Sequence, residues 1–216
     1  AWLSKPLKQC RVAVITTAQI RPRLDGRHGT LIDLEDPRIP AQPTTALPAP
    51  AADDIAYLIY TSGTTGAPKP VAITHQNVAD LLGSLPAELS EPGVWPQCHS
   101  LAFDVSVWEI FGALLRGGRV VVVPEDVVVA PECFHDLLIQ EQVTVLTQTP
   151  SAVMALSSEG LESTVLVVVG EACPAEVVDR WAPGRVMLNA YGPTETTMCV
   201  AITSPLRAQP ASVPIG

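Results

Sequence analysis

The sequence predicts an α/β fold, in which a layered, mostly parallel sheet is flanked by helices. From about residue 53 onward, apolar strand-like runs alternate with helix-like segments. The runs are continuous in Val, Ile and Leu, which is typical of strands buried on both faces of a parallel sheet. The 216 residues are 47% hydrophobic and 16% charged, a composition of a globular domain rather than a disordered chain.

The part before residue 53 is predicted to be an N-terminal segment separate from the α/β core. Residues 11–16 and 30–36 have strand character. Residues 37–53 contain five prolines, which a packed element would not tolerate. We therefore divide the chain into leading strands with a Pro-rich connector (1–52) and an α/β core (53–216).

Within the core, each expected element is set by its periodicity and its end signals. Thr74 is the expected N-cap of the first helix, and proline opens the helices at 131 and 150. Expected strands are 55–60, 98–103, 119–124, 143–147, 164–170 and 185–192. Expected helices are 74–85, 104–118, 131–142, 150–160 and 174–181.

Charge and cysteine content exclude several classes of function. Thirteen basic and twenty-two acidic residues give a net charge of −9, so no nucleic-acid partner is expected. No apolar run is long enough to span a membrane and no signal peptide opens the chain, so we expect no membrane partner. The five cysteines are scattered without a CxxC pair, which favours reduced thiols in a cytoplasmic protein over a disulfide framework or a zinc site. Because the chain lacks an initiator Met and a closing helix, we expect it to be an excerpt of a longer protein.

Three loops at the expected carboxyl edge of the sheet are chemically unusual. The first is YTSGTTGAPKP, residues 60–70, where glycines, hydroxyls and Lys69 follow a strand. Glycines let backbone N–H groups turn toward an anion, and the lysine adds positive charge, so the loop suits a polyphosphate. The spacing is not that of a Walker loop, and a flexible surface turn remains the alternative for this stretch by itself.

The second loop leads into the expected helix at residue 104. Asp104 has an ordinary interpretation as an N-cap, although Val107 at the third helical position rules out a capping box. Asp104 and Trp108 are four residues apart and share a helix face, with Val105 beside them. A carboxylate over an indole and an aliphatic side chain would hold an ammonium group on an apolar body, whereas Trp108 by itself is typical of a core residue.

The third loop, VMLNAYGPTETT at residues 186–197, concentrates polar side chains after a strand. Tyr191 suits stacking on a base, and Asn189 suits reading its edge. Thr194 suits donation to a phosphate, and Glu195 suits oxygen ligation of Mg²⁺. A plain Gly-Pro turn is the alternative for any one of these residues.

The three loops, in this order, resemble the adenylate-forming (AMP-binding) superfamily, and within it the adenylation domains of nonribosomal peptide synthetases. YTSGTTGAPKP resembles the family's phosphate loop, FDVSVWEIFGALLRGG its substrate-pocket helix, and NAYGPTE its nucleotide and magnesium loop. The resemblance implies that an amino-acid carboxylate attacks the α-phosphorus of Mg·ATP to give an aminoacyl adenylate. The acyl group then passes to the phosphopantetheine thiol of a carrier-protein domain, with neighbouring synthetase domains as partners, in secondary metabolite biosynthesis.

The resemblance also implies a role for each residue that matches a family motif. The polyphosphate contacts fall on Thr61, Ser62, Gly63, Thr64, Thr65, Gly66 and Lys69. The residues that match the family's adenine contacts are Asn189, Tyr191 and the backbone of Gly170, Glu171 and Ala172. Thr194 meets the α-phosphate and Glu195 the Mg²⁺, so Lys69, Thr194 and Glu195 are the expected catalytic residues.

Asp104 implies an amino-acid substrate, because it matches the family's partner for the α-ammonium. The rest of the pocket wall falls on Val105, Trp108, Thr147, Val167, Val169, Ala190, Met198 and Cys199. This set has no charge and a single hydroxyl, which favours a hydrophobic amino acid. Two alternatives stay open: an acyl-CoA or aryl-acid ligase of the same superfamily, and a non-catalytic nucleotide-binding relative.

Two departures from the family pattern limit the expected activity. Position 70 is Pro where the family usually has Gly, which removes a backbone donor and predicts slower pyrophosphate chemistry. A C-terminal lid subdomain carrying a catalytic lysine would lie beyond residue 216, so we do not expect this chain to turn over by itself.

Overall fold

A computed structural model describes residues 13–16, 30–33, 37–38, 40–41, 45, 49–62, 68–209 and 212–215. The chain divides into two compact units, Ala1–Ala49 and Pro50–Gly216. In the first unit, β1 (Ala13–Thr16) pairs in parallel with β2 (Thr30–Asp33), which confirms the two strands expected there.

The second unit is built on a four-stranded sheet of order β10-β9-β8-β7. Strands β7 (Val145–Gln148), β8 (Val165–Val169) and β9 (Met187–Tyr191) are parallel, as expected. The short β10 (Ala201–Ile202), which the sequence analysis missed, adds an antiparallel edge. The carboxyl ends of the three parallel strands therefore meet at one edge of the sheet.

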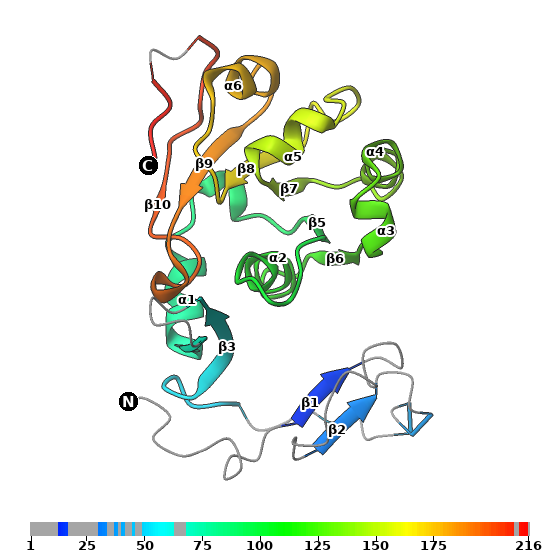
Figure 1. The fold of residues 1–216 in the computed structure, drawn as a ribbon, viewed down its shortest axis with the longest axis vertical. Coiled ribbons are helices and arrows are strands. Elements are labelled where there is room, and N and C mark those ends of the chain that lie inside the picture. The colour runs from blue at the N-terminus through cyan, green and yellow to red at the C-terminus, as the bar shows by residue number, and fades with distance from the viewer. Residues whose placement is uncertain are drawn as a thin grey trace. The chain divides into compact units, whose positions relative to one another are not determined.

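Helices cover both faces of this sheet, which explains the continuous apolar strands. Helices α4 (Pro131–Gln140), α5 (Pro150–Ala155) and α6 (Ala175–Trp181) lie on one face, and α1 (His75–Gly83) and α2 (Val105–Leu114) on the other (Figure 1). Leu166 and Val168 of β8 join the core beneath α4–α6. Their neighbours Val167 and Val169 join the core beneath α1 and α2. The side-chain alternation of one strand thus supplies two cores.

The loop before α2 differs from the sequence prediction. The strand is β5 (Val94–Gln97), parallel to β6 (Arg119–Val122), and not residues 98–103. The backbone N–H groups of Cys98 and His99 donate instead to the carboxylate of Glu109 on α2, so these residues cannot continue a strand ladder. Pro96 lies within β5, and a strand was not predicted there because proline is disfavoured inside strands.

The predicted phosphate loop connects a β-hairpin. β3 (Ile55–Thr61) pairs antiparallel with β4 (Lys69–Thr74), a strand that the sequence analysis missed because it contains Pro70. Thr74 then caps α1 as predicted: its hydroxyl accepts from the Asn77 N–H, and the Asn77 side chain accepts from the Thr74 N–H. The chain therefore passes from hairpin to helix with no intervening loop.

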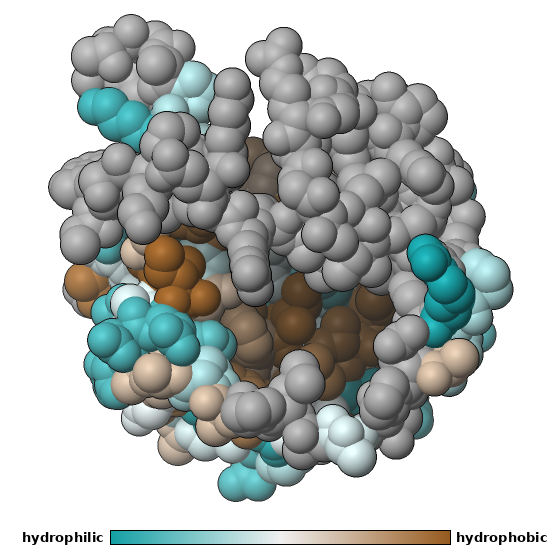
Figure 2. Space-filling model, turned by 90° about the horizontal axis from the view of Figure 1, so that it is seen from below, coloured by the Kyte–Doolittle hydropathy of each residue, from teal (hydrophilic) through white to brown (hydrophobic). Residues whose placement is uncertain are grey.

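Short helices complete the unit: η3 (Ala87–Leu89), α3 (Glu125–Val128) and η4 (Thr194–Thr196). No helix in the described part of the chain is long and apolar enough to cross a membrane. Large apolar side chains are exposed along α2, β6 and the loop before α2, namely Leu101, Phe103, Leu114, Leu115 and Val122. Figure 2, a view from below Figure 1, shows hydrophobic residues at the centre of the view and some hydrophilic residues nearer its edge.

Candidate active site at the carboxyl ends of the strands

A cavity of about 380 Å³ lies at the carboxyl ends of β8 and β9. Ligands of open α/β sheets bind at this edge. The cavity contains all five residues that the sequence analysis assigned to adenine. It is lined by Gly170, Glu171, Ala172, Cys173, Asn189, Ala190, Tyr191, Gly192, Val213 and Ile215.

The side chain of Asn189 is held at the floor of this cavity. Asn189 is 6% exposed, and its backbone N–H donates to Thr203 Oγ1 at 2.9 Å. Its side-chain amide nitrogen donates to the Pro214 carbonyl at 2.7 Å. This bond orients the amide so that its oxygen remains to accept from a ligand. Tyr191, at the end of β9, is 53% exposed and offers its ring at the rim.

Glu171 contributes to the cavity through its backbone. Its carboxylate accepts from the Ser151 hydroxyl at 2.8 Å and from the Ser151 N–H at 3.2 Å, which turns the side chain toward α5. Gly170 has a φ of +88°, a conformation that favours glycine. The turn after β8 thus lines the cavity at the positions that the sequence analysis assigned to adenine.

The loop after β9 is tightly folded around Glu195. Thr194 and Glu195 lie on η4, with the Glu195 side chain exposed. Thr197 and Met198 follow with φ values of +63° and +70°, a left-handed conformation that costs a β-branched residue free energy. A Cβ at Gly192 would lie 2.6 Å from the Met198 carbonyl oxygen, so the chain doubles back closely here. The reversal buries Met198 and Cys199 next to the sheet.

Asp104 is a buried carboxylate without a full set of partners. It occupies the N-cap position of α2, as expected, but its side chain makes no capping hydrogen bond. Its Oδ2 atom is buried and has no hydrogen-bond partner among the residues that the structure describes. Burial raises the pKa of the Asp104 carboxyl; the Thr194 hydroxyl opposes the rise, and the nearby Glu195 adds to it. An uncompensated buried carboxylate is costly, which makes this oxygen a site for a cationic or hydrogen-donating ligand.

The predicted pocket wall forms one apolar cluster next to Asp104. Trp108 is 2% exposed, and its Nε1 donates to Thr147 Oγ1 at 3.0 Å. Trp95 packs edge-on against Trp108, with ring centroids 5.7 Å apart. The remaining predicted wall residues pack in the same core, with Val105 partly buried: Val167, Val169, Ala190, Met198 and Cys199. Trp95 was missed by the sequence analysis, since nothing local links it to Trp108.

Only part of the predicted phosphate loop lies within the described residues. Gly63, Thr64, Thr65 and Gly66 lie outside them. Thr61 and Lys69 face each other across the hairpin, where the Thr61 hydroxyl donates to the Lys69 carbonyl at 3.5 Å. The Ser62 and Lys69 side chains are exposed at this end.

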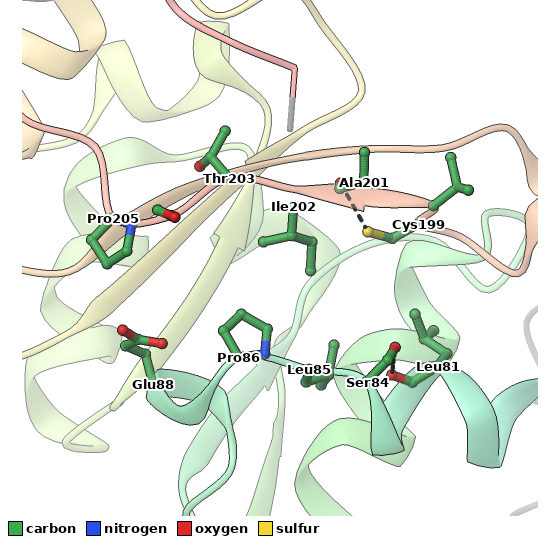
Figure 3. A pocket seen from close by; sticks show the side chains of 12 residues that line it. Leu81, Ser84, Leu85, Pro86, Glu88, Cys199, Ala201, Ile202, Thr203 and Pro205 are labelled. Atoms are coloured by element: carbon green, nitrogen blue, oxygen red, sulfur yellow. Dashed lines mark hydrogen bonds between the residues drawn. The ribbon is translucent and has the colours of Figure 1, made fainter.

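A larger groove of about 490 Å³ lies between the end of α1 and β10 (Figure 3). Two of its polar side chains are engaged within their own segments. The Ser84 hydroxyl donates to the Leu81 carbonyl at 2.8 Å, and the Cys199 thiol to the Ala201 carbonyl at 3.2 Å. We therefore place the candidate site at the smaller cavity, where polar groups converge.

The α/β core with these three loops defines an adenylate-forming type of domain, and comparison with known proteins agrees. The chain belongs to the family of AMP-binding enzymes, whose family model matches residues 4–216. An isonitrile lipopeptide synthase of Mycobacterium tuberculosis is 61% identical over 205 residues, which are 95% of this chain and 8% of that protein.

Two of the solved structures that resemble the chain are described as nonribosomal peptide synthetase proteins. FmoA3 superposes with a TM-score of 0.82 at 28% identity, over 94% of this chain and 23% of that one. PA1221, which contains adenylation and carrier (PCP) domains, gives a TM-score of 0.72 at 29% identity, over 87% and 34% of the respective chains. The resemblance to synthetase adenylation domains is thus confirmed, and the chain spans only a small share of each relative.

Proposed function

We propose that this segment binds an amino acid and Mg·ATP for formation of an aminoacyl adenylate, which a synthetase then loads onto a carrier-protein phosphopantetheine. The observation that carries the proposal is the buried, unpartnered Oδ2 of Asp104. A substrate α-ammonium would supply the missing partner. A carboxylic acid without the amine would leave the carboxylate unpaired, which is the basis of discrimination.

The pocket wall supports a hydrophobic side chain on the amino acid. Its single hydroxyl, on Thr147, already accepts the Trp108 N–H. Val167, Val169 and Met198 are apolar and fully buried in the same cluster. A charged substrate side chain would therefore be desolvated with no partner on the wall.

The cavity at β8 and β9 supports an adenine site. Asn189 Oδ1 would accept from the exocyclic amine, Tyr191 would stack on the ring, and the backbone of residues 170–172 would line the opposite side. The exposed Glu195 carboxylate has the hard oxygen ligands that Mg²⁺ prefers. Lys69 and the hydroxyls of the hairpin loop would neutralise the polyphosphate.

Two relatives support the nucleotide and the partner. FmoA3 has also been solved in an AMPPNP-bound form, with a TM-score of 0.81 at 27% identity to this chain. The PA1221 structure joins an adenylation domain to a carrier domain. A carrier domain and further synthetase domains are therefore the partners we propose.

The test is binding of stable aminoacyl-sulfamoyl-adenosine analogues to this chain by calorimetry. We expect hydrophobic aminoacyl analogues to bind more tightly than Asp- or Lys-bearing ones. Analogues that lack the α-amino group should bind at least tenfold more weakly. Equal binding with and without the amino group would favour an acyl or aryl ligase, and binding of the bare nucleotide with no acyl preference would favour a non-catalytic module.

A further inference from the structure

Three metal-ligating side chains meet beside α2, outside the proposed active site. They are the Cys98 thiol, the His99 imidazole and the Glu109 carboxylate, and their ligand atoms lie within 4.8 Å of one another. Cys98 and His99 directly follow β5, whereas Glu109 projects from α2. Glu109 is 1% exposed, whereas the His99 side chain is 18% exposed and leaves a path to solvent.

The three ligand atoms already approximate one face of a tetrahedron. Cys98 Sγ lies 3.6 Å from His99 Nδ1 and 3.2 Å from Glu109 Oε1, and His99 Nδ1 lies 2.7 Å from Glu109 Oε1. Standard zinc–ligand distances at tetrahedral angles require separations of about 3.5, 3.6 and 3.4 Å for the same three pairs. A bound ion therefore needs the carboxylate oxygen to move by about half an ångström from the other two ligands.

The two oxygens of Glu109 have separate roles in this arrangement. Oε2 accepts the backbone N–H groups of Cys98 and His99, each at 3.2 Å. Among the described residues, Oε1 faces the thiol and the imidazole, the two groups whose protons a metal ion would replace. The backbone N–H groups thus orient the carboxylate through the oxygen that would not bind the ion, as hydrogen-bond partners of metal ligands do.

One further polar side chain of the sheet lies beside the thiol. The amide nitrogen of Gln148, the last residue of β7, lies 3.4 Å from Cys98 Sγ. Rotation of this amide by half a turn brings its oxygen to the same place. Sulfur, nitrogen and oxygen ligands together suit Zn²⁺, which accepts all three, better than Mg²⁺ or Ca²⁺.

We propose that Cys98, His99 and Glu109 form a binding site for one zinc ion. The ion would join the segment after β5 to α2, and this segment ends at Asp104. The site would therefore hold the loop that delivers the substrate-binding carboxylate. It is distinct from the magnesium position at Glu195, and it holds whether or not the proposed aminoacyl function does.

The test is titration of the chelator-treated chain with Zn²⁺ against a chromophoric competitor, with Co²⁺ as a spectroscopic probe. We expect one ion per chain. With Co²⁺ we expect the visible bands of a tetrahedral ion and a near-ultraviolet thiolate-to-cobalt charge-transfer band. Zn²⁺ should also raise the melting temperature, because it binds the folded state.

Matched variants assign the ligands. Cys98→Ser should abolish the charge-transfer band and weaken Zn²⁺ binding at least tenfold, whereas Cys133→Ser, at an exposed cysteine of α4, should change neither. If the circular dichroism spectrum of Cys98→Ser differs from the parent's, the same titrations are made on His99→Asn, with His135→Asn as its control. Absence of a stoichiometric site, or a charge-transfer band that survives Cys98→Ser, would overturn the proposal.

Discussion

Helix α2 carries two buried carboxylates five residues apart, and they differ in how they are satisfied. Glu109 accepts four hydrogen bonds, two from backbone N–H groups and two from the side chains of Cys98 and His99. Asp104 has one oxygen buried without a partner among the described residues. Two buried carboxylates of one helix therefore differ in how completely they are hydrogen-bonded.

The difference separates a carboxylate whose oxygens both accept hydrogen bonds within the protein from one that has an oxygen left for an organic ligand's donor. A satisfied buried carboxylate stabilises the segments it joins, here the end of β5 and α2. An unsatisfied one destabilises the empty protein, and it is retained where a ligand supplies the missing partner. Four predictions follow from this contrast, in order of decreasing effect.

The largest effect is expected on ligand binding by Asp104→Asn. We expect its affinity for a hydrophobic aminoacyl-sulfamoyl-adenosine to fall by about 100-fold or more, because the ligand ammonium loses a buried charge partner. Calorimetry on the parent and variant chains measures the loss. The same analogue without its amino group serves as control and should bind the variant at least as tightly as the parent; an equal loss with that analogue would contradict the assigned role.

The next effect is expected on stability from Glu109→Gln. We expect the free energy of unfolding to fall by about 2–3 kcal/mol, since an amide has only one acceptor oxygen for four donors. Urea titration followed by circular dichroism measures the change. Glu141→Gln, which removes a partly exposed ion pair with Arg119, should cost less than about 1 kcal/mol. Equal costs at the two positions would remove the distinction between Glu109 and a surface carboxylate.

A smaller loss is expected from Thr147→Val beside the pocket. This near-isosteric change leaves the buried Trp108 N–H without its acceptor, at a cost of about 1–2 kcal/mol in the free energy of unfolding. The same urea titration measures it. A variant as stable as the parent would show that the Trp108–Thr147 bond contributes little to holding the pocket wall.

The smallest effect is a pH dependence that originates at Asp104. Burial raises the pKa of this carboxyl above its ordinary value of 3.8, so the folded state binds more protons than the unfolded state between the two pKa values. The contribution of Asp104 to stability therefore falls as the pH rises through this window, and Asp104→Asn removes that fall. Affinity for the amine-bearing analogue should change with the opposite sign, rising with pH as the carboxylate ionises. Parallel pH profiles of parent and variant would contradict the prediction.

Local signals in the sequence were sufficient for most elements of the core. The cap at Thr74, the prolines that open α4 and α5, and the apolar runs of β7, β8 and β9 act over a few residues, and the structure agrees with each. Two strands, β4 and β5, were missed for a reason that is also local. They contain Pro70 and Pro96, and proline is disfavoured in strands unless the ladder leaves its nitrogen unpaired.

The candidate site divides in the same way. The residues assigned to adenine came from the third loop and from the family resemblance, and they line one cavity. The N-cap position of Asp104 was a local inference too, and the position is confirmed although the side chain makes no capping hydrogen bond. Cys98 and His99 gave no metal signal by their spacing, since their third partner comes from a helix ten residues further along.

The sequence by itself determined most helices and the central parallel strands, the family, and the chemical types present in each loop. The tertiary structure decided which buried polar groups are paired. Trp108 finds its acceptor 39 residues away and Asn189 finds Pro214 25 residues away, whereas Asp104 Oδ2 finds no partner in the described part of the chain. Propensities and caps depend on neighbours within one or two turns, but the pairing of a buried group depends on which distant segments the fold brings against it.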